Sequence, residues 1–129
     1  MSAHAAPLAI LFTCTLGALA ILQSLLIAGL PLGRFAWGGQ SARLPSRLRV
    51  AAGASIVIYA VLGLTALART QLIATPLPSP LIHVAMWVIT VYLFLSVLPN
   101  LASKSVHEKR LMTTVSALMA ILALFISLT

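Results

Sequence analysis

The chain of 129 residues is 61% hydrophobic and 7% charged, and its mean hydropathy is +1.13. A soluble domain carries about 25% charged residues, and eight basic residues with one acid could not coat a soluble fold of this size, so lipid must be the solvent. The composition excludes a soluble enzyme, a disulfide-stabilised scaffold and a disordered tail. Cys14 is the single cysteine and has apolar neighbours, so we expect neither an intrachain disulfide nor redox chemistry.

The net charge of +7 indicates membrane topology rather than nucleic-acid binding. Clustered Lys and Arg neutralise phosphates in soluble nucleic-acid-binding proteins. Here the basic residues flank apolar stretches and are not interleaved with aromatic residues on a polar domain. Basic residues in such positions set the orientation of membrane spans and lie against anionic lipid headgroups. We therefore expect lipid contacts and no nucleic-acid partner.

Four apolar stretches follow one another along the chain, at about 8–30, 50–68, 81–98 and 111–128. Each is close to the roughly 20 residues that cross a ~30 Å hydrocarbon core as a helix. None contains a charged residue, and backbone in lipid must satisfy its own hydrogen bonds, so the stretches are predicted to be helices. The connections are short, which favours an all-α membrane protein: one domain, 1–129, folded as an antiparallel bundle of four transmembrane helices.

Local signals mark where these helices begin and end. Pro31–Gly33 is expected to end the first helix, and Pro99–Asn100 the third. Ser79–Pro80 suits the start of the third helix, because proline lacks an N–H that would be unpaired at that position anyway. Ser105–Glu108 has the spacing of a capping box and is expected to start the fourth helix.

The basic residues are divided unequally between the connections. Seven of the eight lie in loops 31–49 and 99–110, and one lies in the connection 69–80. The positive-inside rule therefore puts loops 31–49 and 99–110 in the cytoplasm and both termini outside. The expected location is the inner membrane of a bacterium, as a multi-pass protein.

Small and weakly polar residues indicate which helix faces turn inward, because helices in lipid associate through close packing and hydrogen bonds. Gln23 is the one amide in mid-membrane, and we expect it to bond another helix. The faces of small residues on the first and fourth helices could equally form the contact between copies in a homo-oligomer. The expected faces are Gly17, Ala20, Ser24 and Ala28; Ala52, Ser55, Tyr59 and Gly63; His83, Trp87, Thr90 and Phe94; and Thr113, Ser116, Ala120, Ala123 and Ser127.

Loop 31–49 is the most distinctive segment, and two interpretations of it stay open. Its glycines permit positive φ and close approach of backbone N–H groups to a ligand, and its arginines can form paired bonds to a phosphate or carboxylate. Alternatively, Phe35 and Trp37 anchor the chain at the membrane interface, and the arginines set topology. We favour the second interpretation. The candidate residues for an anion or headgroup site are Arg34, Trp37, Gly38, Gly39, Gln40, Arg43, Arg47, Arg49 and Glu108.

Glu108 is the only acidic residue, and helix capping or pairing with an arginine of loop 31–49 accounts for it. Proton-coupled cation exporters need a carboxylate embedded in the membrane, whereas Glu108 is expected at a junction between loop and helix. His83 is the strongest candidate for an ionisable residue within a span. It lies near the end of the helix, so its ring can find hydrogen-bond partners at the membrane interface.

Metal and cofactor sites are not indicated. His4, His83 and Cys14 match no zinc spacing, and a chain with one carboxylate cannot supply acidic metal ligands or a catalytic pair. Phosphate-binding and hydrolase motifs do not occur either. We expect no catalytic residue, no metal and no cofactor.

The two loops expected in the cytoplasm carry a resemblance to known proteins. The pattern Pro31-x-Gly33-Arg34-x-x-Trp37-Gly38-Gly39, then Leu44-Pro45-x-x-Leu48-Arg49, and later Asn100-x-x-Ser103-x-Ser105-x-x-Glu108, resembles small uncharacterised four-span bacterial membrane proteins. The resemblance extends over most of the chain in layout. It implies the four-span topology and implies no activity.

Two functional hypotheses follow from the sequence. The first is a non-enzymatic accessory protein whose arginine-rich cytoplasmic face binds anionic lipid headgroups or docks on another membrane protein. The alternative is a carrier of a small molecule or lipid, or a lipid-modifying enzyme, with a cavity between the helices. That cavity would open at the cytoplasmic face beside Arg34, Trp37, Gln40 and Glu108.

Overall fold

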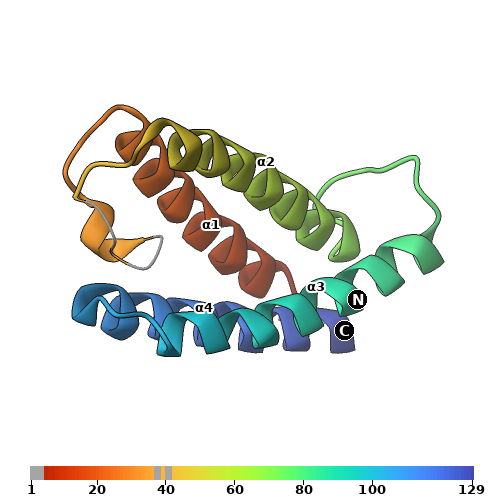
Figure 1. Ribbon diagram of the computed structural model, residues 1–129. Helices are drawn as coiled ribbons and strands as arrows, with labels where there is room; N and C mark the ends of the chain where they lie inside the picture. The colour runs from red at the N-terminus through yellow and green to blue at the C-terminus, as the bar shows by residue number, and fades with distance from the viewer. Residues whose placement is uncertain (1–4, 37–38, 40–41) are drawn as a thin grey trace.

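The protein is an all-helical bundle. The computed structural model describes residues 5–36, 39 and 42–129. Four long helices follow in chain order, with a 3-10 turn η1 (Gly33–Phe35) between the first two (Figure 1). Each has 23 or 24 residues and is apolar enough to cross a membrane, so the chain is a multi-pass membrane protein, as predicted. The helices are α1 (Ala5–Ile27), α2 (Ser46–Arg69), α3 (Ser79–Leu101) and α4 (Val106–Leu128).

Two helices carry charged residues in their first turns, ahead of their apolar stretches. The first turn of α2 contains Arg47 and Arg49, and the first turns of α4 contain Glu108, Lys109 and Arg110. Hydropathy detects only the part of a helix that lies in hydrocarbon, whereas backbone hydrogen bonding continues into the headgroup region. The helices are therefore longer than the expected spans at these ends.

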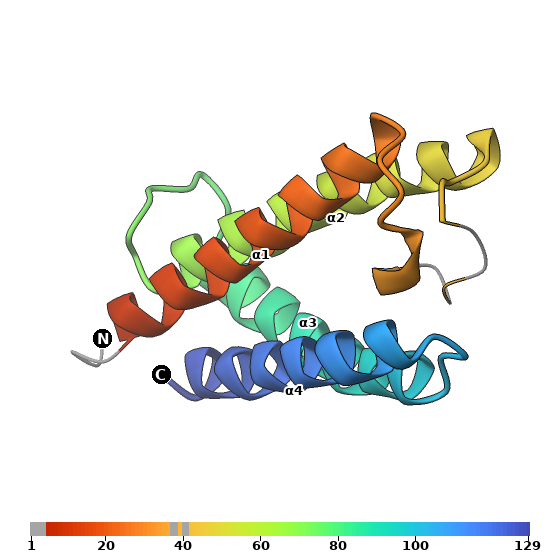
Figure 2. The same cartoon turned by 90° about the vertical axis from the view of Figure 1, so that its left-hand side faces the viewer.

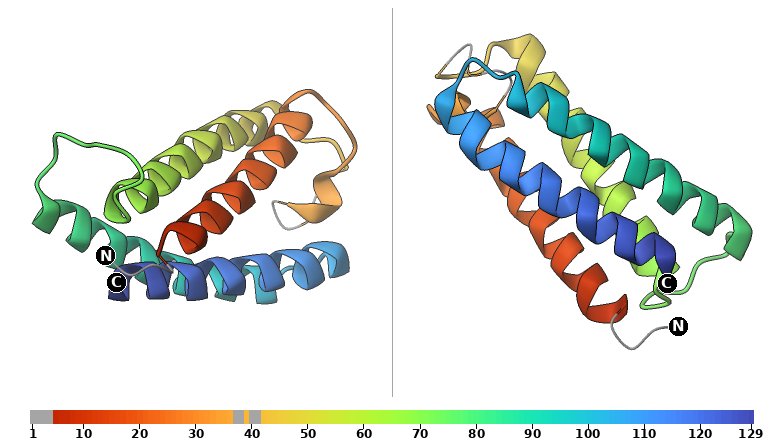
Figure 3. Two further views of the ribbon diagram at one scale, coloured as in Figure 1. Left: turned by 180° about the vertical axis from the view of Figure 1, so that it is seen from behind. Right: turned by 90° about the horizontal axis from the view of Figure 1, so that it is seen from below.

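The helices form two antiparallel hairpins, α1 with α2 and α3 with α4, stacked as two layers (Figures 1 and 2). The layers converge where α1 begins and α4 ends, which we call the termini end (Figure 3). They diverge at the opposite end, where η1 lies between them, which we call the loop end. The bundle is therefore shaped like a wedge.

The main core fills the termini end. Buried alanines from α1, α2 and α4 let the helices approach closely there, which is the usual way in which helices associate in lipid. The hydroxyls of Thr90 and Ser127 join α3 to α4 across this core at 2.9 Å. The most buried members of the core are Ala9, Phe12, Ala66, Met86, Ala120, Ala123 and Ile126.

Two of the four expected inward faces are confirmed. On α2 and α4 the small and polar residues do turn inward, Ala52 and Ser127 among them. On α1 the prediction is wrong, because Gly17, Ser24 and Ala28 are exposed and larger apolar residues take the buried face. The Ser24 hydroxyl donates a hydrogen bond to the Ala20 carbonyl of its own helix at 2.8 Å, so this side chain can face lipid.

On α3 the expected face is wrong in part, because Thr90 is buried as predicted but other members of that face are not. His83 and Phe94 are exposed, whereas Ile82, Met86 and Leu93 are buried. Aromatic and histidine side chains tolerate lipid or the interface, so their helical spacing alone did not reveal the packed face.

Gly29 ends α1 earlier than Pro31–Gly33, the expected stop. The Leu30 N–H donates to the Leu25 carbonyl, and the Gly29 N–H donates to the Leu26 carbonyl, both at 3.1 Å. Gly29 has φ +96°, a conformation that glycine adopts without a Cβ penalty. This pair of bonds is the Schellman motif, which satisfies carbonyls that the helix end would otherwise leave unpaired.

Pro99 does not end α3, contrary to the sequence prediction. The helix continues through Pro99 and Asn100 to Leu101. Pro99 has no backbone N–H, so the helix continues there without the bond that this residue would otherwise donate. The Asn100 side chain donates to the Ser96 carbonyl at 3.2 Å and so adds a bond to the same turn.

Candidate functional site

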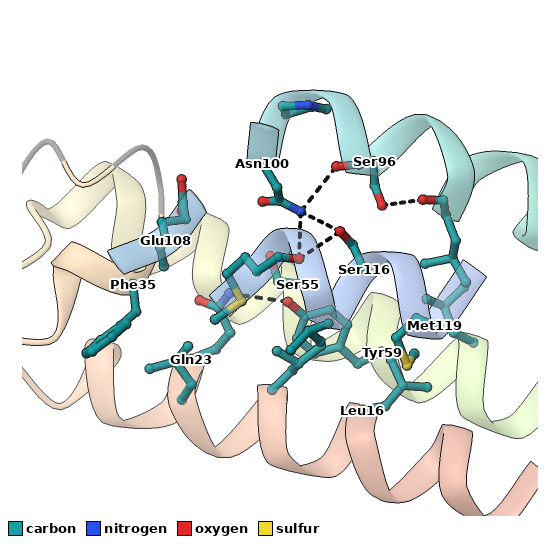
Figure 4. A pocket seen from close by; sticks show the side chains of 18 of the residues that line it. Leu16, Gln23, Phe35, Ser55, Tyr59, Ser96, Asn100, Glu108, Ser116 and Met119 are labelled. Carbon is teal, nitrogen blue, oxygen red and sulfur yellow. Dashed lines mark hydrogen bonds between the residues drawn. The ribbon is translucent and has the colours of Figure 1, made fainter. Parts of the chain in front are cut away.

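A cavity of about 370 Å³ lies between the two hairpins on the loop-end side of the main core (Figure 4). All four helices and η1 contribute to its wall. Four apolar side chains of the main core also line the cavity, so the core closes it toward the termini end. They are Leu16, Leu62, Leu93 and Met119. The polar side chains in its wall are Gln23, Ser55, Tyr59, Tyr92, Ser96, Asn100, Glu108 and Ser116.

Gln23 forms the polar contact of the first hairpin. Its Nε2 donates to the Tyr59 hydroxyl at 3.3 Å, joining α1 to α2 (Figure 4). Gln23 is 7% exposed, and both side chains line the cavity. The predicted interhelical bond of Gln23 is confirmed.

Asn100 forms the polar contact of the second hairpin. Its Nδ2 donates to the Ser116 hydroxyl at 3.0 Å and lies 3.4 Å from the Met112 carbonyl, which joins α3 to α4 (Figure 4). From the sequence, Asn100 was expected only to help end the third helix. An amide one turn from the end of an apolar stretch was the signal that could have identified it.

Two cavity serines use their protons within their own helices. Ser55 Oγ donates to the Ala51 carbonyl at 3.1 Å, and Ser96 Oγ donates to the Leu93 carbonyl at 2.7 Å. A hydroxyl has one proton and two lone pairs, so these oxygens face the cavity as acceptors. Asn100 Oδ1 accepts no hydrogen bond from the described residues and is a further acceptor.

Glu108 is buried, with 6% of its surface exposed, and it lines the cavity from the first turn of α4. Its backbone N–H donates to Ser105 Oγ at 3.3 Å, which confirms the predicted N-cap. The Ser105 N–H donates to Ser103 Oγ at 3.1 Å, so Ser103 takes the place that a capping box gives to the glutamate. Glu108 thus lies at the junction between loop and helix, as predicted, and its side chain is also part of the cavity wall. Its pairing with an arginine of loop 31–49 stays a prediction.

The segment around η1 bridges the hairpins across the loop end. Ala36 and Leu44 pack against Leu26 and Ala52 of the first hairpin in a second, smaller core. Toward the second hairpin, the Phe35 ring meets the His107 ring edge to face, with 5.7 Å between centroids.

Gly39 also lies against the second hairpin. Gly39 has φ +69°, and a Cβ on it would collide with Ser105. This contact brings loop 31–49 against loop 99–110, as their shared side predicts. Phe35 in the same segment lines the cavity, so its predicted role as an interfacial anchor is incomplete.

The candidate arginines lie in different places. Arg43 and Arg47 are exposed, and the Arg49 Nε donates to the Leu44 carbonyl at 2.9 Å. None of the three lines the cavity. Trp37, Gly38, Gln40 and the side chain of Arg34 lie outside the described residues, so the anion site expected at this loop stays a prediction.

Metal ligands do not gather in the described part of the chain, where no three His, Cys, Asp or Glu side chains could hold an ion. Cys14 and His83 are exposed, on α1 and α3 respectively. Among the described residues, the polar side chains that line the cavity carry hydroxyls, amides and one carboxylate.

Known proteins do not help to interpret the cavity: neither protein-family models, nor curated proteins, nor solved structures match this chain. The residues of the cavity itself must therefore indicate what it binds. The chain is a multi-pass membrane protein whose two helix hairpins border a cavity with a mainly apolar wall and eight polar side chains.

Proposed function

We propose that this protein is a ligand-binding membrane protein of the carrier type, which holds a small molecule or lipid in the cavity between its hairpins. The observation that carries the proposal is the convergence of eight polar side chains from four helices on one cavity. Polar groups inside a membrane protein are costly and commonly mark a substrate pathway. Two bonded pairs, Gln23 with Tyr59 and Asn100 with Ser116, join the helices within each hairpin, and the other polar side chains of the wall add to the polar surface of the cavity.

The size of the cavity supports the same proposal. Pockets for small ligands and cofactors occupy roughly 300–1,000 Å³, and this cavity has about 370 Å³. Its wall is mainly apolar, with a few polar groups placed to orient a ligand, which is the usual composition of such sites.

The charge distribution supports an orientation. Five basic side chains at the loop end are exposed to solvent or headgroups. By the positive-inside rule, this end faces the cytoplasm of a bacterial inner membrane, and the cavity lies on that side. The five residues are Arg43, Arg47, Lys104, Lys109 and Arg110.

The same five basic residues favour a second candidate function. An exposed basic face binds anionic headgroups, at about 1 kcal/mol for each Lys or Arg near the surface. Such a face could equally dock the protein on an acidic membrane partner. This candidate needs no ligand in the cavity, so the two proposals can be separated by experiment.

Native mass spectrometry of the protein, released from gently extracted membranes, tests the first proposal. We expect a defined small-molecule adduct on the wild type. Ser96→Leu, which places a larger side chain into the cavity, should remove the adduct. Ser24→Leu is the matched control, because Ser24 also bonds a carbonyl of its own helix but faces lipid.

Absence of an adduct from the wild type, or equal retention by Ser96→Leu, would contradict the carrier proposal. Loss of a bound lipid from Arg43→Gln/Arg47→Gln, with Ser96→Leu unaffected, would instead support the headgroup-binding candidate.

A further inference from the structure

The wall of the cavity between the hairpins is enriched in aromatic and thioether side chains. Of the chain's eight aromatic residues and four methionines, five line this one cavity. They are Phe35 of η1, Tyr59 of α2, Tyr92 of α3, and Met112 and Met119 of α4. Figure 4 shows Phe35, Tyr59 and Met119 around the cavity. Rings and sulfur atoms therefore border the cavity from three helices and the 3-10 turn.

The main core of the same bundle is built differently. Its buried side chains include one aromatic ring, that of Phe12, among aliphatic residues and two methionines. The helices thus pack mainly through aliphatic side chains where they touch, and rings collect where the hairpins separate. This distribution indicates a binding role for the rings of the cavity wall in addition to packing.

Such a wall favours an aromatic ligand over an aliphatic ligand of the same size. Aromatic rings attract one another edge to face or offset, in addition to the gain from burying their surface. Methionine sulfur also makes favourable contacts with aromatic rings. An aliphatic ligand would gain from burial alone. Because the rings and sulfur atoms stand on several sides of the cavity, a flat ring between the hairpins can contact more than one of them.

The serines of the wall favour a hydrogen-bond donor on that ring. Ser55 and Ser96 line the cavity and donate their protons to carbonyls of their own helices, α2 and α3. Their oxygens keep lone pairs and can accept a hydrogen bond from a ligand. A hydroxyl on an aromatic ring is a donor of this kind.

We propose that the ligand is a hydroxylated aromatic compound, of the phenol or naphthol type, held between the two hairpins. Its ring lies among the aromatic and methionine side chains of the wall, and its hydroxyl donates to Ser55 or Ser96. This inference rests on the proposed function and adds the chemical class of the ligand.

The test uses the whole chain in phosphatidylcholine nanodiscs, with 1-naphthol as the probe. Its matched comparison is decahydro-1-naphthol, which has the same carbon skeleton and hydroxyl but no aromatic ring. Equilibrium dialysis measures the binding of each, and empty nanodiscs give the share of each compound that dissolves in lipid. We expect 1-naphthol to bind at least about tenfold more tightly, because only its ring gains from the aromatic and sulfur contacts. Equal or weaker binding of 1-naphthol would overturn the proposal.

Removal of one ring tests where the ligand lies. Tyr92→Leu should weaken the binding of 1-naphthol about fivefold and leave that of decahydro-1-naphthol unchanged. Phe94→Leu is the control, because Phe94 is on the same helix and does not line the cavity. Both rings are about half exposed, so the bundle should fold, and circular dichroism checks this. Equal binding of 1-naphthol by the two variants would overturn the proposed position of the ring.

Removal of the sulfur atoms tests the same position from α4. Met112→Leu/Met119→Leu nearly conserves side-chain volume and should weaken the binding of 1-naphthol about threefold. Met86→Leu is the control, because Met86 is buried in the main core and does not line the cavity. An equal loss from Met86→Leu would show that the effect comes through packing and would overturn the sulfur contacts.

A third comparison tests the hydroxyl. 1-Methoxynaphthalene has no donor and should bind to the wild type about fivefold less tightly than 1-naphthol. Ser55→Ala/Ser96→Ala should remove most of this difference, because the accepting oxygens are gone. Ser24→Ala should preserve it, because Ser24 also bonds its own helix but faces lipid. A difference that persists in Ser55→Ala/Ser96→Ala would overturn the assignment of the hydroxyl.

The outcomes separate this proposal from the carrier proposal. If the wild type keeps a native adduct but binds 1-naphthol no better than decahydro-1-naphthol, the aromatic class is overturned and the carrier proposal stands. If the wild type has no adduct and binds neither compound, both are overturned.

Discussion

The two ends of the bundle are built from the same four helices but pack in opposite ways. At the termini end, Ala9, Ala66 and Ala123 are fully buried, and the hairpins meet through apolar contacts. At the loop end, the inward positions carry longer or polar side chains such as Gln23 and Asn100, and the hairpins separate around a cavity. Side-chain size along each inward face therefore sets how closely the hairpins approach.

Hydrogen bonds form at both ends. At the loop end, Gln23 bonds Tyr59 and Asn100 bonds Ser116, each within one hairpin. At the termini end, Arg69 of α2 donates to the Thr129 carbonyl that follows α4, which links the two hairpins at 2.9 Å.

The largest effect should come from the packed end. Phe12→Ala is expected to destabilise the protein by about 3 kcal/mol, because Phe12 is 0% exposed and its removal leaves a void. Phe94→Ala is the control, since Phe94 is 46% exposed to the bilayer. Both rings have apolar surroundings, so the difference measures packing alone. Equilibrium unfolding in lipid gives both values, and equal losses would contradict a packed termini end.

Overpacking should have the next largest effect. Ala66→Leu adds bulk at a fully buried contact and should cost about 2 kcal/mol, whereas Ala54→Leu, at an exposed position of the same helix, should be close to neutral. The same unfolding measurement applies. A neutral Ala66→Leu would show that the hairpins can separate at the termini end as easily as at the loop end.

Two helix ends permit a smaller test. Gly29→Ala forces φ +96° on a residue with a Cβ and should cost about 1 kcal/mol. Gln71 at the end of α2 has φ +62°, and the Leu72 N–H donates to the Leu67 carbonyl at 2.9 Å, so this helix ends in the same motif. Gln71→Gly should therefore stabilise by about 0.5 kcal/mol. Melting temperatures that move in the same direction would contradict this account.

Effects of similarly small size should come from the polar pairs. Thr90→Val breaks the bond to Ser127 at the termini end, and Gln23→Leu breaks the bond to Tyr59 at the loop end. Each should cost about 0.6 kcal/mol, the average for such bonds in membranes. Gln23→Leu alone should also lower ligand occupancy, measured by native mass spectrometry. Equal loss of ligand from both variants would show that the effect comes through stability rather than through the cavity.

The sequence by itself determined the four spans, the N-cap at Ser105 and the interhelical bond of Gln23. These features depend on hydropathy over one helix length, on local hydrogen bonding, or on the cost of a polar group in lipid, all of which a single segment expresses. The inward faces of α2 and α4 were predictable for the same reason.

The tertiary structure decided the rest. It alone showed that larger residues form the buried face of α1, that α3 continues through Pro99, and that Glu108 lines a cavity shared with Asn100. In lipid, an apolar side chain is about as stable facing the acyl chains as facing the bundle interior, so hydrophobicity does not reveal the packed face. The cavity exists because the hairpins diverge, and their divergence depends on contacts between residues far apart in the chain.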